Sequence, residues 1–411
     1  MHILVTLLGK VKDPKFSNYQ EANYLFDNGN KYTSRFFGLT LQKEQKPDKL
    51  VVLGTSGSMW DNLMREAGVD DESVKALDNL SQTSSVDESV LRDYVPALER
   101  HIGIPCHLEI IPYGRNADEQ TQILHSLMKN FAENDEATLD VTHGFRHLPM
   151  LVQQSALLLQ TLKSVKINGI FYGAWDMRDE NDISPVMRLD GLIDVERWTK
   201  ALYRYEQDGD YAAFRKPLKA SGAAEATLKS LDAAAYFERT FNLTKAGIEL
   251  KKVKQALEAT NQSGISSFFT GSLLKHISWS DSVSLQQRQA NLAHFYLERG
   301  DFVRASIFAM ESFITSLLKH NEKNQQQNFR VRSKATKDFK NAYDQKVNSD
   351  RGNTNLFPIY EELSKIRNAL AHGTEPSNAI AHLMENQQEI ETTLKRLFDE
   401  LGIQKNPSAQ A

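Results

Sequence analysis

The sequence predicts an α/β Rossmann-like N-terminal domain with a parallel sheet, followed by an all-α helical C-terminal domain. Up to about residue 195, short apolar runs alternate with helix-like segments, and beyond that point only helical periodicity remains. The length of 411 residues suits two or three domains. We therefore expect a first domain at 1–195, a helical linker region at 196–270 and a second domain at 271–411.

Five short segments of the first domain have the composition of buried strands, because they are rich in β-branched residues and end at Gly or Pro. Helix-like stretches lie between them, and this order predicts a parallel sheet covered on both faces. Residues 184–192 predict an added hairpin strand, and Asn28-Gly29 indicates the turn of a second hairpin. The five strand segments are 2–9, 49–58, 106–114, 137–144 and 166–175, and the helix-like stretches include 116–134 and 148–164.

The second half contains amphipathic stretches with apolar residues at helical spacing. Asp194 suits the N-cap of the first helix there, and Gly300-Asp301 indicates a tight turn between two helices. In the first half, the Asp- and Ser-rich segment 70–90 is typical of a surface loop. The expected helical stretches are 223–262, 283–299, 301–320, 355–371 and 377–401.

Composition excludes several classes of function. The net charge of −4 argues against non-specific electrostatic binding of nucleic acid by the whole surface, so any such binding needs a local basic patch. The only cysteine, Cys106, excludes a disulfide framework and a cysteine-rich zinc site, and it fits a reducing cytoplasm. No apolar stretch is long enough to span a bilayer, and residues 1–13 lack the features of a signal peptide. We therefore expect a cytoplasmic protein with no membrane partner.

Polar loops follow three of the predicted strands, at 7–13, 53–60 and 140–149. In an open parallel sheet, ligands bind beyond the carboxyl ends of the strands. Glycines in these loops let backbone N–H groups approach a ligand, and Arg146 precedes a helix whose first turn holds Pro149. Because N–H groups and the dipole at a helix start favour negative charge, the loops predict an anion-accepting pocket.

Each of these features also has a structural explanation. Gly/Ser/Thr loops after strands often only turn the chain, and a lone His143 is more typical of a hydrogen-bonded structural histidine. Asp140 could simply cap the following loop. No glycine-rich dinucleotide fingerprint follows the first strand and no GxxxxGK[ST] occurs, so a nicotinamide or ATP site is not supported. The convergence of three loops on one edge favours the ligand site.

The stretch Asp140–Gly144 reads DVTHG and matches the DxTHG signature of a CRISPR-associated protein family, and the blocks LLGK and VVLGTSGSMW resemble the same family. The resemblance implies a CARF domain, a Rossmann-like sensor that dimerises and binds cyclic oligoadenylate. Cyclic tetraadenylate is the expected allosteric activator, and no metal or cofactor is expected. The residues implied to contact the ring or its phosphates are Gly9, Lys10, Thr55, Ser56, Gly57, Ser58, Thr142, His143, Gly144 and Arg146.

Near the C-terminus, residues 365–376 read KIRNALAHGTEP. Arg367, Asn368 and His372 fit the R-x4-6-H motif and are similar to the catalytic motif of HEPN nucleases. Metal-free RNA cleavage needs the 2′-OH deprotonated and the leaving 5′-O protonated, and histidine can do either near neutral pH. A guanidinium can stabilise the charge on the phosphorane, and Asn368 could orient the Arg or His side chain.

The spacing of this motif sets a geometric condition. On an ideal helix, positions five apart lie about 140° apart, so Arg367 and His372 do not share a face. They converge only if the helix ends near Ala371, and Gly373 and Pro376 are the expected stop signals. Because one chain supplies one Arg and one His, a homodimer or higher even oligomer could pair two copies in one cleft. The structural alternative is a helix end whose cations complement the macrodipole.

Upstream of this motif, residues 317–340 gather cations. They form either a solvated surface or a patch for the RNA backbone, and the sequence favours neither interpretation. The cations are Lys319, Lys323, Arg330, Arg332, Lys334, Lys337 and Lys340.

Together these features predict a cyclic oligoadenylate-activated, metal-independent endoribonuclease of type III CRISPR antiviral defence. It would cut single-stranded RNA in the helical dimer and leave a 2′,3′-cyclic phosphate. Two alternatives stay open. The helical half could bind nucleic acid or protein in a ligand-responsive regulator that cleaves nothing, or the sensor domain could also degrade its own cyclic ligand.

Overall fold

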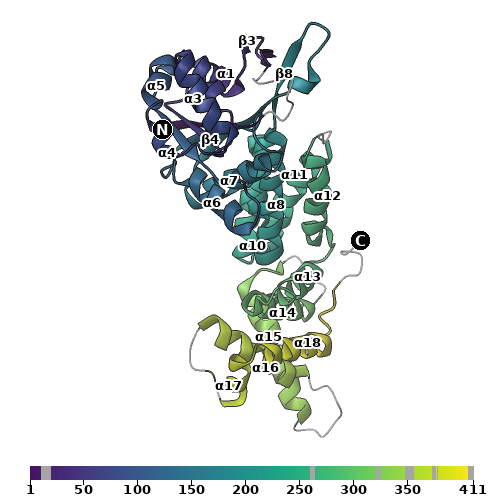
Figure 1. The fold of residues 1–411 in the computed structure, drawn as a ribbon. Helices are drawn as coiled ribbons and strands as arrows, with labels where there is room; N and C mark the ends of the chain where they lie inside the picture. Colours follow the sequence, from purple (N-terminus) through teal and green to yellow (C-terminus); the bar gives the residue numbers. More distant parts are fainter. Residues whose placement is uncertain are drawn as a thin grey trace. The chain divides into compact units, whose positions relative to one another are not determined.

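The computed structural model describes residues 1–10, 20–259, 264–319, 322, 325–347, 356–372, 376 and 378–405 (Figure 1). The chain divides into two compact units, Met1–Ile193 and Asp194–Ala411. This division lies close to the boundary expected at residue 195. Within the described ranges, no helix is both long and apolar enough to cross a membrane.

The N-terminal unit is built around an eight-stranded sheet with the order β3-β2-β8-β7-β6-β1-β4-β5. Strands β5, β4, β1, β6 and β7 are parallel neighbours, whereas β8 runs antiparallel to β7 and β2 forms a hairpin with β3. The five expected strands, the added hairpin strand and the turn at Gly29 are therefore confirmed. The strands are β1 (His2–Leu8), β2 (Ala22–Leu25), β3 (Lys31–Ser34), β4 (Lys49–Gly54), β5 (Cys106–Ile110), β6 (Glu136–Asp140), β7 (Lys166–Gly173) and β8 (Ile183–Arg188).

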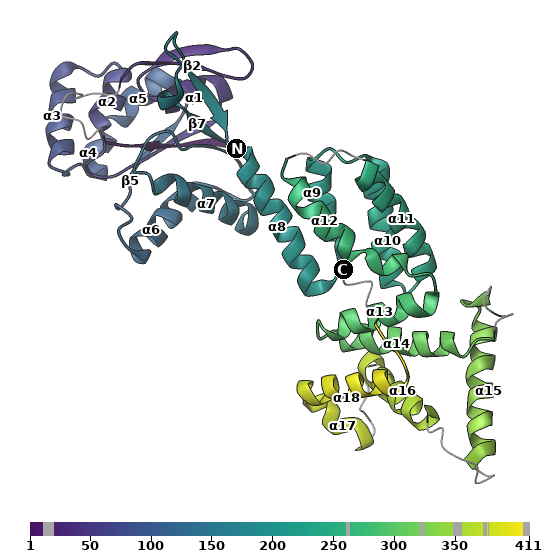
Figure 2. The same ribbon diagram turned by 90° about the vertical axis from the view of Figure 1, so that its right-hand side faces the viewer.

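Helices cover both faces of this sheet (Figure 2). Alternate residues of a strand point to opposite faces, so in β1 Leu4 packs with the cluster of α1–α5 while Ile3 and Val5 pack with that of α6 and α7. Both apolar layers are fully buried, and this fixes the strand ends that carry the loops. The helices are α1 (Phe37–Gln45), α2 (Trp60–Glu66), α3 (Asp71–Gln82), α4 (Glu88–Arg92), α5 (Val95–Ile102), α6 (Ala117–Met128) and α7 (Leu148–Leu162).

Most of the segment 70–90 is helical, in α3 and the start of α4, so the expectation of a surface loop was wrong. Asp70 caps α3 by accepting a hydrogen bond from the Ser73 backbone N–H. Val74 and Leu77, one turn apart, then bury one side of the helix against the sheet. The acidic residues Asp71 and Glu72 are exposed, whereas Ser81 is buried beside the apolar residues.

The second unit is helical and has one hydrophobic cluster that extends from Trp198 to Ile403. Because this cluster includes residues of 196–270 and of 271–411, the separation of a linker region at residue 270 stays a prediction. The longer helices are α8 (Asp190–Asp208), which crosses the division between the units, α10 (Glu225–Arg239), α11 (Leu243–Ala259), α12 (Ser266–His276), α13 (Leu285–Leu297), α14 (Phe302–Ser316), α15 (Phe329–Val347), α16 (Leu356–His372), α17 (Asn378–Glu385) and α18 (Gln387–Glu400).

The helical unit differs from the prediction in three places. The described part of the stretch 223–262 holds two helices, α10 and α11, because the chain turns at Phe241, whose φ is 60°. Helix α8 begins at Asp190, before the N-cap expected at Asp194. Helix α15 was not predicted as a separate element. The tight turn at Gly300 is confirmed, and Asp301 caps α14.

Candidate functional sites

The three polar loops follow adjacent parallel strands and therefore lie at the same sheet edge. In the register of the sheet, Leu8 pairs with Gly54 and Thr6 pairs with Asp140. The Ser58 hydroxyl donates to the Leu8 carbonyl at 2.8 Å, and the next residue, Met59, donates its N–H to Gly9 at 2.9 Å. Because β1 lies between β4 and β6, the chain reverses its direction of strand addition here, which is the usual place for a ligand crevice.

Buried hydrogen bonds hold the DVTHG loop. Asp140 is fully buried and accepts from the Thr6 hydroxyl at 2.6 Å and from the Thr142 N–H at 2.8 Å. Burial raises the pKa of Asp140 to about 6, against the opposing effect of these hydrogen bonds. The Thr142 hydroxyl in turn accepts from the Gly173 N–H at 2.8 Å. Asp140 thus caps the loop, and Thr142 joins the loop to β7.

His143 also holds this loop in place. Its Nε2 accepts from the Phe37 N–H at 3.2 Å, and its ring stacks on Phe36 with centroids 5.2 Å apart. Burial lowers the pKa of His143 to about 4, so the imidazole is neutral near pH 7. Gly144 has a φ of 105°, and a Cβ there would approach Leu7 at 3.4 Å. The loop therefore requires glycine at this position.

The second loop uses its own hydroxyls internally. The buried Ser58 hydroxyl accepts from the Thr55 N–H at 2.9 Å, and the Thr55 carbonyl accepts from the Trp60 indole. Ser56 is half-buried. At Gly57 a Cβ would lie 2.8 Å from the Tyr113 hydroxyl, so a larger residue would displace that side chain.

Sequence reasoning missed Tyr113, which lies in the loop after β5. Its hydroxyl donates to Ser84 at 3.0 Å, and its ring meets Phe145 of the third loop at 5.8 Å between centroids. Burial opposes ionisation, but hydrogen bonding with Ser84, Ser56 and Thr55 holds the pKa of Tyr113 below its usual value. The signal was present, because Tyr113 follows the fourth adjacent parallel strand at the same edge.

The polar groups of the three loops therefore fall into two sets. Thr55, Ser58, Thr142 and His143 have side chains engaged in internal hydrogen bonds. Lys10 and Arg146 are exposed, and within the described part of the chain neither has an ion-pair partner. Ligand contacts by any residue of either set stay a prediction.

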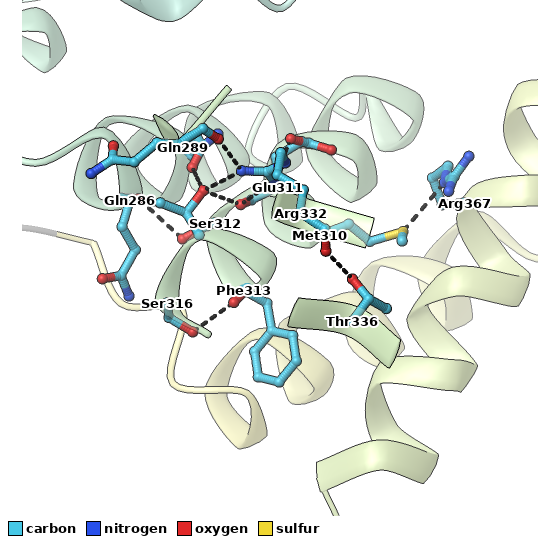
Figure 3. Close-up of polar contacts among 12 residues, drawn as sticks. Gln286, Gln289, Met310, Glu311, Ser312, Phe313, Ser316, Arg332, Thr336 and Arg367 are labelled. Atoms are coloured by element: carbon cyan, nitrogen blue, oxygen red, sulfur yellow. Dashed lines mark hydrogen bonds and ion pairs between the residues drawn. The ribbon is translucent and has the colours of Figure 1, made fainter. Parts of the chain in front are cut away.

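The second candidate site lies on α16. Tyr360, Leu363 and Ile366 bury one side of this helix against α14 and α18. Arg367 is half-buried, and its Nε donates to the Met310 sulfur of α14 at 3.3 Å (Figure 3). Asn368 and His372 are both exposed. The motif thus combines one anchored cation with two accessible polar side chains.

This helix ends one residue beyond the expected position near Ala371. Helix α16 runs through His372, and Gly373 lies outside the described residues. Arg367 and His372 are therefore on one continuous helix, where positions five apart are separated by about 140° around the axis. A single chain does not bring the two side chains together in this conformation, so a joint site depends more strongly on a second chain.

The cations of 317–340 do not form one uniform patch. Arg332 forms an ion pair with Glu311 of α14 at 2.6 Å and donates to Thr315, so it holds two helices together (Figure 3). Lys319 is exposed, and so are four cations along α15, whereas Lys323 lies outside the described residues. The four exposed cations of α15 are Arg330, Lys334, Lys337 and Lys340.

Comparison with known proteins addresses the first unit. Residues 3–176 match the family model described as "CRISPR system endoribonuclease Csx1, CARF domain". The chain is also 28% identical over 223 residues to "CRISPR-associated protein MJ1674" of Methanocaldococcus jannaschii, covering 49% of this chain. The match spans 35% of that relative's length.

Residues 3–176 form a CARF domain. The chain therefore contains a domain of the Csx1 CARF family, and it is similar to a CRISPR-associated protein. The expected fold, a Rossmann-like unit of mostly parallel strands followed by a helical region, is confirmed. The CARF match ends before α8, so it does not include α16. The prediction of a site at Arg367, Asn368 and His372 therefore depends only on their geometry and on the sequence motif.

Proposed function

We propose that this protein is a cyclic oligoadenylate-activated, metal-independent endoribonuclease. The observation that carries the proposal is a CARF domain in the same chain as an RNALAH helix with His372 exposed at its end. The proposal also includes the RNA substrate, the cyclic activator and the dimer. The activator is a ring such as cyclic tetraadenylate, and the substrate is single-stranded RNA.

In the CARF domain, the ring binds over the loops at the carboxyl edge of the sheet. Lys10 and Arg146 supply positive charge without an internal partner among the described residues, which suits phosphates. The first turn of α7, with Pro149, follows the DVTHG loop, so the dipole at the start of this helix also favours negative charge there. The buried hydrogen bonds of Asp140, Thr142 and His143 keep this backbone in place before the ligand arrives. A two-fold dimer would present every loop twice to a symmetric ring.

In the helical unit, Arg367 and His372 act on the scissile phosphate. The guanidinium of Arg367 stabilises the charge that develops on the phosphorane. His372 moves a proton, either from the attacking 2′-OH or to the departing 5′-oxygen, and the product is a 2′,3′-cyclic phosphate. Since the two side chains diverge on one helix, each cleft takes its Arg from one chain and its His from the partner.

The test is cleavage of single-stranded RNA by the purified protein with and without cyclic tetraadenylate or cyclic hexaadenylate. Wild-type protein should cut only when a ring is present. His372→Ala should lose cleavage while still binding the ring. His382→Ala is the matched control, because His382 is also exposed but lies on α17 outside the motif. Arg367→Ala is compared with Lys365→Ala, an exposed cation on the same helix.

The outcomes separate the possible functions. Normal cleavage by His372→Ala or Arg367→Ala would disprove the proposed active site. Ring binding without any RNA cleavage would favour a regulator instead. Loss of the intact ring during incubation, in wild type and in His372→Ala alike, would assign ring degradation to the CARF domain.

A further inference from the structure

A polar pocket of about 330 Å³ lies in the helical unit, on the side of α14 that carries Glu311. This volume is at the lower end of the range for ligand pockets, roughly 300–1,000 Å³. Its walls come from the turn between α10 and α11, from α13 and α14, and from the chain around the start of α15. The lining residues are Thr240, Phe241, Asn242, Leu285, Gln289, Glu311, Gln326, Gln327 and Arg332.

The pocket carries no unbalanced charge. Its only cation, Arg332, donates to Glu311 at 2.6 Å, to Thr315 at 3.0 Å and to the Gln326 carbonyl at 2.9 Å. Figure 3 shows Arg332, Glu311 and Gln289 meeting at this wall. Since the guanidinium is occupied by a carboxylate and two further acceptors, the pocket is poorly suited to phosphate and better suited to a neutral polar group.

The other groups of the pocket suit a flat, neutral polar ligand, because they include side-chain amides and an aromatic ring. Gln289 is 5% exposed, and its Oε1 accepts from the Thr315 hydroxyl at 2.8 Å. Its amide nitrogen has no hydrogen-bond partner among the described residues, so this donor is available to a ligand. Asn242 likewise uses its Oδ1 for the Lys245 N–H and keeps its amide nitrogen available within the described part of the chain.

Phe241 adds an aromatic surface. Its backbone has a φ of 60°, a conformation that costs a non-glycine residue about 1–3 kcal/mol and that often marks functional positions. The ring is 38% exposed and packs against Phe308 with centroids 5.1 Å apart. A partly exposed ring beside amide donors is the combination by which proteins recognise unpaired RNA bases, through stacking and hydrogen bonds to the base edge.

We infer that this pocket binds one unpaired base of the RNA substrate and acts as the specificity subsite of the nuclease. The inference rests on the proposed function. Two features connect the pocket to an RNA strand. On one side, exposed Arg330 lies two residues from Arg332, and Lys334 and Lys337 follow it on the same side of α15, where they can accompany phosphates. On the other side, Glu311 adjoins Met310, whose sulfur contacts Arg367.

The test is a map of the bases around each cut in a random-sequence RNA, made with ring-activated protein. Wild type should prefer particular bases at one fixed position relative to the cut. Gln289→Glu keeps the acceptor for Thr315 but removes the donor, and Asn242→Ala removes the second amide. Each change should lower kcat/KM on the preferred RNA by about 10- to 100-fold and flatten the preference at that one position. Gln286→Ala is the control, since this amide is on α13 but does not line the pocket.

The result can be separated from the proposed function. If ring-activated cleavage is intact and all three variants keep the wild-type base preference, the subsite is wrong and the nuclease stands. If no RNA is cut, calorimetric titration with the four nucleosides and with inorganic phosphate decides. Binding of a nucleoside, but not of phosphate, that weakens in Gln289→Glu would support a base pocket even then. No nucleoside binding would overturn it.

Discussion

The loops of the CARF domain are fixed by buried hydrogen bonds, whereas the end of α16 presents His372 and Asn368 to solvent. In the first site, Asp140, Thr142 and His143 each have a partner on another strand, loop or helix. In the second, Arg367 has a sulfur contact from α14. The motif residues of the CARF loop thus shape a backbone, while α16 leaves Asn368 and His372 accessible.

This difference has a practical meaning for mutagenesis. Changing a side chain that holds a loop removes stability first and function as a consequence. Changing an exposed reactive side chain removes function at little cost in stability, since surface substitutions usually stay within about 0.5 kcal/mol. Variants of the two sites should therefore separate into stability effects and activity effects.

The largest expected effect is on catalysis. Arg367→Ala and His372→Ala should each reduce ring-activated cleavage by about 10²–10⁴-fold, the usual contribution of a positioned acid or base. If each cleft combines Arg from one chain with His from its partner, mixed dimers of the two variants hold one intact cleft. An equimolar mixture, dissociated and reassembled, should regain about a quarter of wild-type activity, since half the dimers are mixed and each has half its clefts.

A mixture of two differently tagged His372→Ala preparations is the control and should stay inactive. If the mixture of Arg367→Ala and His372→Ala is as inactive as its components, the site is not shared between chains. The geometry of one continuous α16 would then have to change before catalysis.

The next largest effect is on CARF stability. Asp140→Ala leaves the Thr6 hydroxyl and the Thr142 N–H without their acceptor, at about 1–3 kcal/mol for each buried group. Asp140→Asn should cost less, because the remaining oxygen can still accept from the Thr142 N–H. Hydrogen exchange should accelerate in β1 and β6 of Asp140→Ala but not in α14 or α16. If hydrogen exchange in β6 is unchanged, Asp140 does not stabilise the CARF loop, and the proposed difference between the two sites is wrong.

The positions of the strands and of the loops at their ends were predictable, but the roles of the loop side chains were not. Apolar runs with Gly at their ends give the strands and their order along the chain, and the parallel arrangement then places the loops together. The partners of His143 and Thr142 are Phe37 and Gly173, which are distant in sequence. No local sequence pattern indicates that these side chains form hydrogen bonds within the protein.

The errors in the helical regions have similar causes. In α3, the apolar spacing of Val74 and Leu77 is masked by acidic and hydroxyl residues. The break at Phe241 carries no Gly or Pro signal. The end of α16 differs from the prediction by one residue, which is within the usual uncertainty of helix ends, yet the geometry of Arg367 and His372 depends on it. The base pocket combines residues from segments that share no motif.

The affinity for cyclic tetraadenylate tests whether the exposed cations of the CARF loops, rather than the internally bonded side chains, contact the ligand. Lys10→Ala and Arg146→Ala should each weaken cyclic tetraadenylate binding by about 10- to 100-fold, because a hydrogen bond to a charged group contributes about 1.5–3 kcal/mol. The loss should shrink at high salt, and stability should be unchanged. Lys166→Ala is the control, since Lys166 begins β7 at the opposite end of the sheet. Equal affinity in all four proteins, measured by calorimetry, would mean that these cations do not face the ring.

The smallest effect concerns the charge of His143. Its pKa of about 4 lies below the ordinary value of 6.5, so the folded protein binds fewer protons than the unfolded chain between these values. The stabilisation is complete above pH 6.5 and is lost as pH falls toward 4. Between pH 7.5 and 5.5 the loss should be about 1 kcal/mol, reduced somewhat because the ring is only partly shielded from water.

His143→Gln offers an oxygen to the Phe37 N–H without titrating, so its free energy of unfolding should fall less over this interval. Denaturant unfolding of both proteins at the two pH values measures this change in the free energy of unfolding. Burial raises the pKa values of Asp140 and Glu238, but their contributions are the same in wild type and in His143→Gln and therefore cancel. An identical pH dependence in wild type and His143→Gln would show that the imidazole titrates normally. His143 would then be free to carry charge toward a phosphate, and the CARF loop would resemble the end of α16 more closely than its hydrogen bonds indicate.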